Sequence, residues 1–236
     1  AGRDLVKEYT EAVREAGMKV GIYFSLIDWS DPRYRSVYPE GSDPKDHLQD
    51  VFATPAGGPE DPEKWQEFLE FNNNQMRELM TNYGTVDLLW FDGDWERSAN
   101  QWKAKEFKAY LESLNPNVIV NSRLQGYGDY ETPEQGIPLY GPKGVWEFCT
   151  TINDSWGYRP SDNHYKTSKQ IIRMFCDCLT LGGKMLLDVG PKEDGTLDER
   201  QVKVLEDLGT FIHDNEEAIY ETEKGLSYSQ FLGGST

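Results

Sequence analysis

The chain has 236 residues, 37% of them hydrophobic, so it can bury one sizeable core and is expected to form a single domain over residues 1–236. Its 24 basic and 41 acidic side chains give a formal net charge of −17, which disfavours nucleic acid and anionic lipid surfaces as partners. No apolar run reaches the ~20 residues that a membrane span needs, so no membrane association is predicted.

Cysteine and histidine give no sign of a disulfide framework or a metal site. The three cysteines, Cys149, Cys176 and Cys178, have no repeated spacing, and we expect three small buried side chains. The three histidines have no metal-ligand spacing, so neither a metal nor an organic cofactor is predicted. The chain opens without Met inside a helical pattern, so we expect a truncated N-terminus, which leaves the compartment unassigned.

Helical and strand patterns alternate along the chain. Residues 2–16 carry apolar side chains at helical spacing before Gly17, and residues 18–29 form a β-rich apolar run. Residues 30–61 are rich in Pro and Gly and are predicted to form a long loop, a kind of segment that is usually functional. The later predicted elements are a helix at 62–83, a strand at 86–93, a helix at 100–114, a strand at 117–123, a loop at 124–143, a strand at 145–151, a helix at 168–181, a strand at 184–191, a helix at 197–215 and a short strand at 218–221.

This order predicts an α/β fold built from parallel βαβ units, which fits either a doubly wound sheet or a barrel. A TIM-like (β/α) barrel is favoured because long loops follow strands and polar residues mark the predicted C-terminal ends of strands, where such barrels have their active face. These polar residues are Asp28, Asp92, Asn121 with Arg123, Glu147 and Asp188. With six predicted strands, the barrel is expected to be incomplete by two.

Asp92 is the strongest candidate for chemistry, because it ends the strand LLWFDG between an aromatic residue and a glycine. The aromatic flank favours desolvation, and the glycine lets a ligand approach; the plainer interpretation is a capping or loop aspartate. Retaining glycoside hydrolysis needs a second carboxyl group about 5–5.5 Å away. The sequence offers Glu131, Glu134 and Glu147, and spacing alone leaves the choice between Glu134 and Glu147 open.

A cation and several aromatic rings accompany these carboxylates. Arg123 could hold a nucleophile ionised and bind a hydroxyl group, or could form a structural ion pair. Four tryptophans fall near predicted strand ends, namely Trp90, Trp95, Trp146 and Trp156. We expect at least one of them to pack in the core, whereas one facing a pocket would stack on the apolar face of a sugar.

Five segments carry a resemblance to a known family: GIYFSLIDWS, VDLLWFDG, GDYETPEQ, VWEFCTTINDSWGY and GGKMLLDVGPKEDGTL. In this order, over about residues 5–221, they resemble the α-L-fucosidases of glycoside hydrolase family 29. The resemblance implies a retaining exo-α-L-fucosidase that hydrolyses terminal α-L-fucosyl linkages through a covalent glycosyl-aspartate intermediate. It also implies a fucosylated oligosaccharide or glycoconjugate as partner, no cofactor, and compatibility with a periplasmic or secreted location.

The resemblance also assigns residues. Asp92 matches the family nucleophile, and Glu134 matches the acid/base, with Glu147 as the reserve for that role. The residues that match the fucose-binding pocket are Tyr23 with Phe24, Trp90, Arg123 as a fucose-contacting arginine, and Trp156 as an aromatic ring against the fucose methyl group.

Two parts of the family pattern have no counterpart in the chain: the first two strands with their His-rich segments, and the C-terminal β-sandwich. The open edge of the expected barrel could be covered by a second copy of the chain. Two alternatives stay open: a catalytically weak or inactive fucose-binding fragment, and a glycosidase that acts on another sugar, because fold does not fix function.

Overall fold

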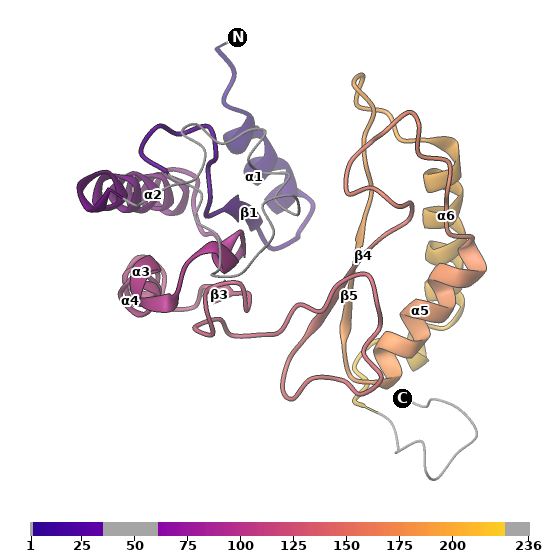
Figure 1. The fold of residues 1–236 in the computed structure, drawn as a ribbon. Coiled ribbons are helices and arrows are strands. Elements are labelled where there is room, and N and C mark those ends of the chain that lie inside the picture. Colours follow the sequence, from indigo (N-terminus) through magenta and orange to yellow (C-terminus); the bar gives the residue numbers. More distant parts are fainter. Residues whose placement is uncertain (1, 35–60, 225–236) are drawn as a thin grey trace, which may run out of the picture. The chain divides into compact units, whose positions relative to one another are not determined.

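The computed structural model describes residues 2–34 and 61–224 (Figure 1). It contains two compact units, Ala1–Asp129 and Tyr130–Thr236. One barrel domain over residues 1–236 therefore stays a prediction. Most of the predicted loop at 30–61 lies outside the described residues. Within those residues, no helix has the length and apolar character to span a membrane.

The first unit contains a parallel three-stranded sheet in the order β1-β2-β3. Its register places Tyr23 opposite Trp90, and Ser25 opposite Asp92. The elements of this unit are α1 (Leu5–Glu15), β1 (Gly21–Ser25), α2 (Pro62–Asn82), β2 (Leu88–Asp92), the 3-10 helix η3 (Asp94–Glu96), α3 (Ala99–Trp102), α4 (Ala104–Leu114) and β3 (Ile119–Val120).

Local chemistry explains where the helices of this unit begin. The Asp61 side chain accepts hydrogen bonds from the first backbone N–H groups of α2, and Pro62 occupies the first turn, where no N–H donor is needed. The helix predicted at 100–114 is divided in two, because Lys103 adopts a left-handed conformation with φ of 51° between α3 and α4. A capping box between Ser98 and Gln101 starts α3 at Ala99, one residue before the predicted start.

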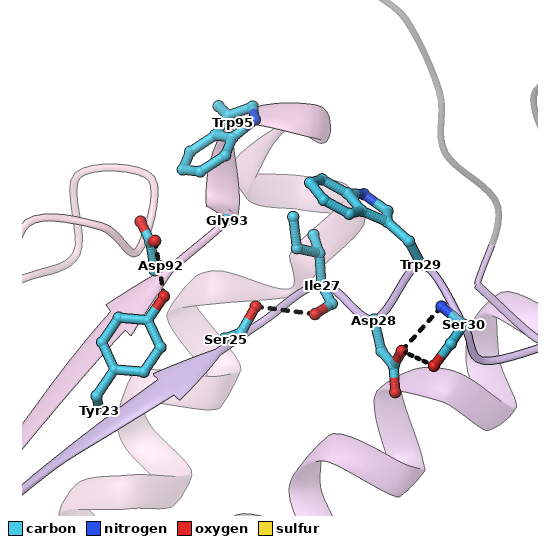
Figure 2. A pocket seen from close by; sticks show the side chains of 9 residues that line it. All are labelled: Tyr23, Ser25, Ile27, Asp28, Trp29, Ser30, Asp92, Gly93 and Trp95. Atoms are coloured by element: carbon cyan, nitrogen blue, oxygen red, sulfur yellow. Dashed lines mark hydrogen bonds between the residues drawn. The ribbon is translucent and has the colours of Figure 1, made fainter. Parts of the chain in front are cut away.

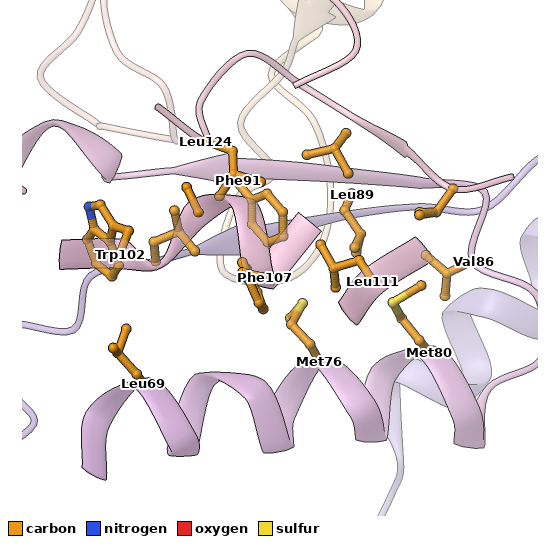
Figure 3. Close-up of a cluster of buried hydrophobic side chains, with 14 of the residues drawn as sticks. Leu69, Met76, Met80, Val86, Leu89, Phe91, Trp102, Phe107, Leu111 and Leu124 are labelled. Atoms are coloured by element: carbon orange, nitrogen blue, oxygen red, sulfur yellow. The ribbon is translucent and has the colours of Figure 1, made fainter. Parts of the chain in front are cut away.

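The core of the first unit lies between the sheet and helices α2 and α4. Figure 3 shows Met76 of α2 facing the sheet, with Leu89 and Phe91 of β2 and Leu111 of α4 close by. All four side chains are fully buried, and each contributes about 1.5–3 kcal/mol by leaving water. This packing fixes the strand whose last residue is Asp92.

The second unit pairs β4 (Glu147–Thr151) in parallel with β5 (Lys184–Asp188), and helices α5 (Ser168–Thr180) and α6 (Glu199–Asp214) pack beside them (Figure 1). Trp146 and Phe148 are fully buried, which confirms that at least one of the four tryptophans belongs to the core. Cys149 and Cys178 are buried as expected, whereas Cys176 is only half-buried.

The short strand predicted at 218–221 is wrong. Residues Glu216–Ala218 form the 3-10 helix η4, and the backbone N–H groups of Ile219 and Tyr220 both donate to the Glu216 carbonyl. These local bonds satisfy the backbone groups that a strand would offer to a neighbour. The described residues therefore hold five of the six predicted strands, in an α/β arrangement with parallel pairing in each unit.

Candidate active site

A pocket of about 440 Å³ opens at the C-terminal ends of β1 and β2 (Figure 2). Asp92, the last residue of β2, lies in it with 23% of its side chain exposed. The residues that line the pocket are Tyr23, Ser25, Ile27, Asp28, Trp29, Ser30, Asp92, Gly93 and Trp95. The pocket thus lies at the strand ends that the α/β pattern predicts, with a partly exposed carboxylate in it.

Both carboxylate oxygens of Asp92 accept hydrogen bonds. The Tyr23 hydroxyl donates to Oδ2 at 2.8 Å, and Nη1 of Arg123 donates to Oδ1 at 2.5 Å. The Arg123 guanidinium lies 4.6 Å from the centre of the Trp90 ring, which stacks on Tyr23 at 5.6 Å. The structure therefore brings together Tyr23, Trp90, Asp92 and Arg123, and these charge-assisted bonds orient the carboxylate.

The chain turns sharply after Asp92. Gly93 has a φ of 84°, and a Cβ at this position would lie 2.6 Å from Cγ1 of Ile27, so only glycine fits. The two acidic residues that follow, Asp94 and Glu96, are buried, although their place in the sequence suggests rim or capping groups. Burial is possible because each finds internal donors: the backbone N–H of Gln125 bonds to Asp94 at 2.7 Å, and the Tyr34 hydroxyl bonds to Glu96 at 2.6 Å.

Asn121 fixes β2 next to Asp92. It follows the two-residue strand β3 and is fully buried. Its Oδ1 accepts from the Phe91 N–H at 2.9 Å, and its Nδ2 donates to the Phe91 carbonyl at 2.8 Å. The Asn121 amide thus replaces a strand backbone as the partner of Phe91, which explains why β3 is shorter than the predicted strand 117–123. The only hint in the sequence is an amide that directly follows the apolar run VIV.

We expect Asn121→Ala to lower the free energy of unfolding by about 2–4 kcal/mol, because it leaves the buried N–H and C=O of Phe91 without partners. Urea unfolding measures this difference. Asn117→Ala is the matched control, since Asn117 is exposed and its loss should change stability by less than about 0.5 kcal/mol. An equal small effect of both substitutions would show that the Asn121 amide does not hold β2.

The remaining carboxylate candidates lie in the second unit, beside β4. The segment predicted as the loop 124–143 forms two isolated parallel bridges there, Glu131 with Trp146 and Glu134 with Cys149. The backbone around Glu134 is fixed because the Cys149 N–H donates to Pro133 at 2.9 Å and the Gln135 N–H donates to Cys149 at 2.8 Å. Glu134 therefore lies on an anchored stretch of chain next to the middle of a strand.

Glu147 is the first residue of β4, so its predicted place at the C-terminal end of a strand is wrong. The apolar run begins earlier in the sequence, but Val145 and Trp146 lie before the strand. The phenol of Tyr130 lies near Glu147; burial raises the pKa of Tyr130, and the negative charge of Glu147 raises it further. Glu134 lies beside Cys149, two residues closer to the C-terminal end of β4, the end where parallel sheets place their active groups.

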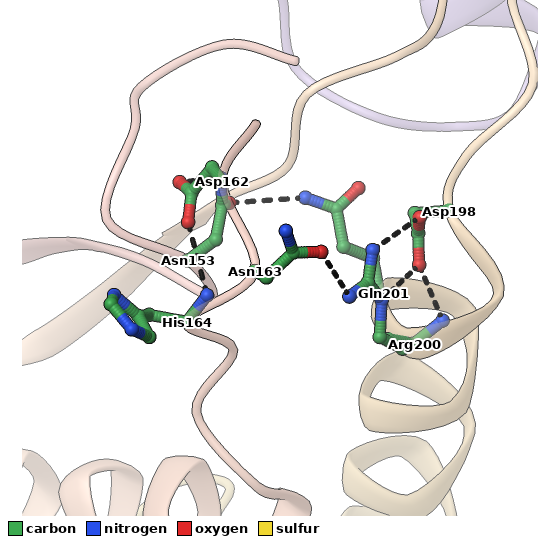
Figure 4. A network of polar contacts seen from close by, with 7 residues as sticks. All are labelled: Asn153, Asp162, Asn163, His164, Asp198, Arg200 and Gln201. Carbon is green, nitrogen blue, oxygen red and sulfur yellow. Dashed lines mark hydrogen bonds and ion pairs between the residues drawn. The ribbon is translucent and has the colours of Figure 1, made fainter. Parts of the chain in front are cut away.

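Trp156 lies in the segment after β4, with 45% of its surface exposed. A polar network ties this segment to α6 (Figure 4). Asn153 donates to Asp162 at 2.8 Å, and Gln201 of α6 donates to Asn153 at 3.3 Å. The His164 N–H donates to the other Asp162 oxygen at 3.2 Å. Burial opposes ionisation of Asp162, but these hydrogen bonds outweigh it and lower its pKa to about 2.

Acid should remove the contribution of Asp162 to the free energy of unfolding. Its folded pKa lies below the value of about 3.9 for an unfolded Asp, so the contribution is fully present above pH 4 and is lost as the pH falls toward 2. We therefore expect the stability difference between wild type and Asp162→Asn to shrink from pH 5 to pH 2 in urea unfolding. Asp177→Asn, at an exposed site on α5, is the control. A difference that stays constant over this range would contradict the assignment.

A hydrogen-bonded carboxylate in a pocket with aromatic walls, at the C-terminal ends of parallel strands, is typical of α/β enzymes that act on carbohydrates. In the part of the chain that the structure describes, no group of three or more His, Cys, Asp or Glu could hold a metal ion. The hydrogen-bonded, partly exposed Asp92 suits carboxylate chemistry.

Comparison with known proteins agrees with this class. The family model for α-L-fucosidase matches residues 1–217. The chain is 30% identical over 230 residues to an α-L-fucosidase of Dictyostelium discoideum and 32% identical over 235 residues to the tissue α-L-fucosidase of Rattus norvegicus. These matches cover 93% and 94% of this chain but 46% of each relative. The chain belongs to the α-L-fucosidase family, glycoside hydrolase family 29.

Solved structures give the same result. The chain superposes on α-L-fucosidase isoenzyme 1 from Paenibacillus thiaminolyticus with a TM-score of 0.82 and 34% identity, covering 100% of this chain and 58% of that one. A second similar structure, with a TM-score of 0.76 and 28% identity over 94% of this chain and 52% of that one, is a trapped covalent intermediate of an α-L-fucosidase from Bacteroides thetaiotaomicron in complex with 2-fluoro-fucosyl fluoride. The α/β fold of the chain is therefore that of α-L-fucosidases.

Proposed function

We propose that this chain carries the catalytic site of a retaining exo-α-L-fucosidase, with Asp92 as nucleophile. One observation carries the proposal: in a chain of this family, the Asp92 carboxylate lies in a pocket at the end of β2, oriented by Tyr23 and Arg123. The substrate class is a terminal α-L-fucosyl group of an oligosaccharide or glycoconjugate. A neutral substrate also suits a chain with a formal net charge of −17.

The reaction takes two steps. An oxygen of Asp92 attacks the anomeric carbon, the glycosidic C–O bond breaks, and the leaving oxygen takes a proton from an acid, which gives a fucosyl-aspartate ester. Water then attacks the same carbon, the acid/base residue takes the proton of that water, and the ester bond breaks. Arg123 and Tyr23 hold the carboxylate for attack, and the attacking oxygen exchanges a hydrogen bond for the ester bond.

Glu134 is the proposed acid/base, and Glu147 is the alternative. Two features support Glu134: its neighbouring backbone is hydrogen-bonded along β4, and it pairs nearer the C-terminal end of that strand than Glu147 does. Trp90 is proposed to line the fucose pocket, and Trp156 to pack its ring against the fucose methyl group. Neither role needs a metal or an organic cofactor.

The proposed architecture is a TIM-like (β/α) barrel to which the five described strands belong. Parallel pairing in both units and the similarity to α-L-fucosidase structures support it. The prediction that a second copy of the chain covers the barrel edge is tested by sedimentation, where it requires a dimer or larger assembly.

The test of function compares 4-nitrophenyl α-L-fucoside with the matching α-galactoside and α-glucoside, and follows the first-formed sugar anomer by NMR. We expect turnover of the fucoside alone, with α-L-fucose as the first product, because two displacements restore the configuration. β-L-Fucose as first product would contradict the covalent route. Fucose binding by calorimetry without turnover would favour the inactive fucose-binding alternative.

A further inference from the structure

Two tryptophan rings border the pocket beyond the proposed nucleophile. Figure 2 shows Trp29, from the segment after β1, and Trp95, from η3, beyond the strand ends and past Ile27 and Gly93. Trp95 is 54% exposed, whereas Trp29 is half-buried. The residues that contact Asp92 itself, Tyr23 and Arg123, bind its two carboxylate oxygens. The two tryptophan rings therefore border a part of the pocket that lies beyond the contacts of Asp92 with Tyr23 and Arg123.

The exposure of Trp95 is built into the turn. Its neighbours Asp94 and Glu96 are both buried. The Asp94 carboxylate accepts from the Gln125 N–H at 2.7 Å, and the Trp102 indole donates to the Asp94 carbonyl at 2.9 Å. Because the residues on both sides of Trp95 are fixed inward, the ring between them is held outward at the pocket on a rigid support.

Trp29 is held by the same turn. Its indole N–H donates to one oxygen of Glu96 at 3.0 Å, and the hydroxyl of the fully buried Tyr34 donates to the other at 2.6 Å. The polar edge of Trp29 is thus used inside the protein. What Trp29 can offer a ligand is therefore an apolar face, and the exposed ring of Trp95 presents the same kind of surface beside it, which suits a ring rather than a charged group.

We propose that Trp29 and Trp95 form the subsite for the leaving group, and that they recognise the apolar face of the sugar ring to which fucose is attached. This inference rests on the proposed function, since a leaving group exists only if Asp92 attacks a fucoside. The fucosyl carbon must reach Asp92, and the two indoles border the same pocket beyond the ends of β1 and β2, where they can contact the group that leaves that carbon. Glu96 is a positioning residue that sets the Trp29 ring.

The experiment measures kcat/KM of wild type, Trp95→Ala and Trp95→Phe with three fucosyl donors. 4-Nitrophenyl α-L-fucoside and a fucosyl-galactose disaccharide have ring leaving groups, whereas α-L-fucosyl fluoride has none. For each ring-bearing donor, we take the ratio of its kcat/KM to that of the fluoride. We expect Trp95→Ala to lower this ratio by about three- to tenfold, and Trp95→Phe to restore most of it. Tyr220→Ala, which removes an aromatic side chain of similar exposure outside the pocket, is the control.

Each outcome decides a different claim. An equal loss on all three donors would place Trp95 against the fucosyl group and overturn the leaving-group subsite, while the proposed hydrolysis would stand. A loss with the nitrophenyl donor but not with the disaccharide would overturn recognition of a sugar ring. If the wild type turns over none of the donors, the proposed hydrolysis fails, and the subsite fails with it.

Discussion

Asp92→Ala is expected to lower kcat for 4-nitrophenyl α-L-fucoside by about 10⁴-fold, because the variant has no group that can form the covalent intermediate. The side chain is partly exposed and lies at the end of its strand, so the fold should survive its truncation. The matched control is Asp28→Asn, at a second carboxylate in the same pocket, whose hydrogen bonds within the described residues go to Ser30. The kcat of this control should fall by about tenfold at most.

Azide sharpens this test. The space left by the Asp92 carboxylate can admit a small anion, which would attack the anomeric carbon in its place and release β-L-fucosyl azide. We expect azide to raise the rate of Asp92→Ala and not that of Asp28→Asn. Residual activity near wild type in Asp92→Ala, or rescue that yields α-L-fucosyl azide, would place the nucleophile elsewhere.

Glu134→Gln is expected to lower kcat for a fucosyl disaccharide by about 10²–10⁴-fold, because a poor leaving group needs a proton as the bond breaks. α-L-Fucosyl fluoride needs less help at that stage, so its loss should be smaller. Glu147→Gln is the matched control, since Glu147 begins β4 and should affect both donors far less. The kinetic measurement is kcat for both donors in both variants.

The reverse order of effects would assign the acid/base to Glu147. Azide again separates the roles: in an acid/base variant it attacks the fucosyl-aspartate ester and gives α-L-fucosyl azide, the anomer opposite to the product of the nucleophile variant. Glu134→Gln without any loss on the disaccharide would remove Glu134 from the mechanism.

The fold was predictable where one pattern dominated. Two predicted elements match the structure: the apolar run 86–93 is β2 (Leu88–Asp92), and the helix pattern 62–83 is α2 (Pro62–Asn82). In each of them, the burial of one or both faces determines the hydrophobic pattern of the sequence. The helix predicted at 100–114 is divided because the capping box at Ser98 and the left-handed Lys103 override helix propensity. The strand predicted at 218–221 failed because nothing in the described residues pairs with it and the turn satisfies its own backbone.

The candidate site was predictable to the extent that parallel strands bring their C-terminal ends together. This rule explains why Tyr23 and Arg123 meet Asp92, although 69 and 31 residues separate them in sequence. The bonds from Trp29 and Tyr34 to Glu96 could not be predicted, because they join positions 67 and 62 residues apart through a buried carboxylate that looks like a surface group in sequence. The sequence identifies Asn121 only as a polar strand-end residue, since its role depends on the exact register with Phe91.

The most direct test of the account is covalent trapping. The wild-type chain is incubated with 2-deoxy-2-fluoro-α-L-fucosyl fluoride, and the intact protein and its peptides are analysed by mass spectrometry. We predict the mass of one added fluorofucosyl group, carried by the peptide that contains Asp92. A label on another carboxylate, or no label in a chain that turns over fucosides, would contradict the central claim that Asp92 forms the glycosyl-enzyme.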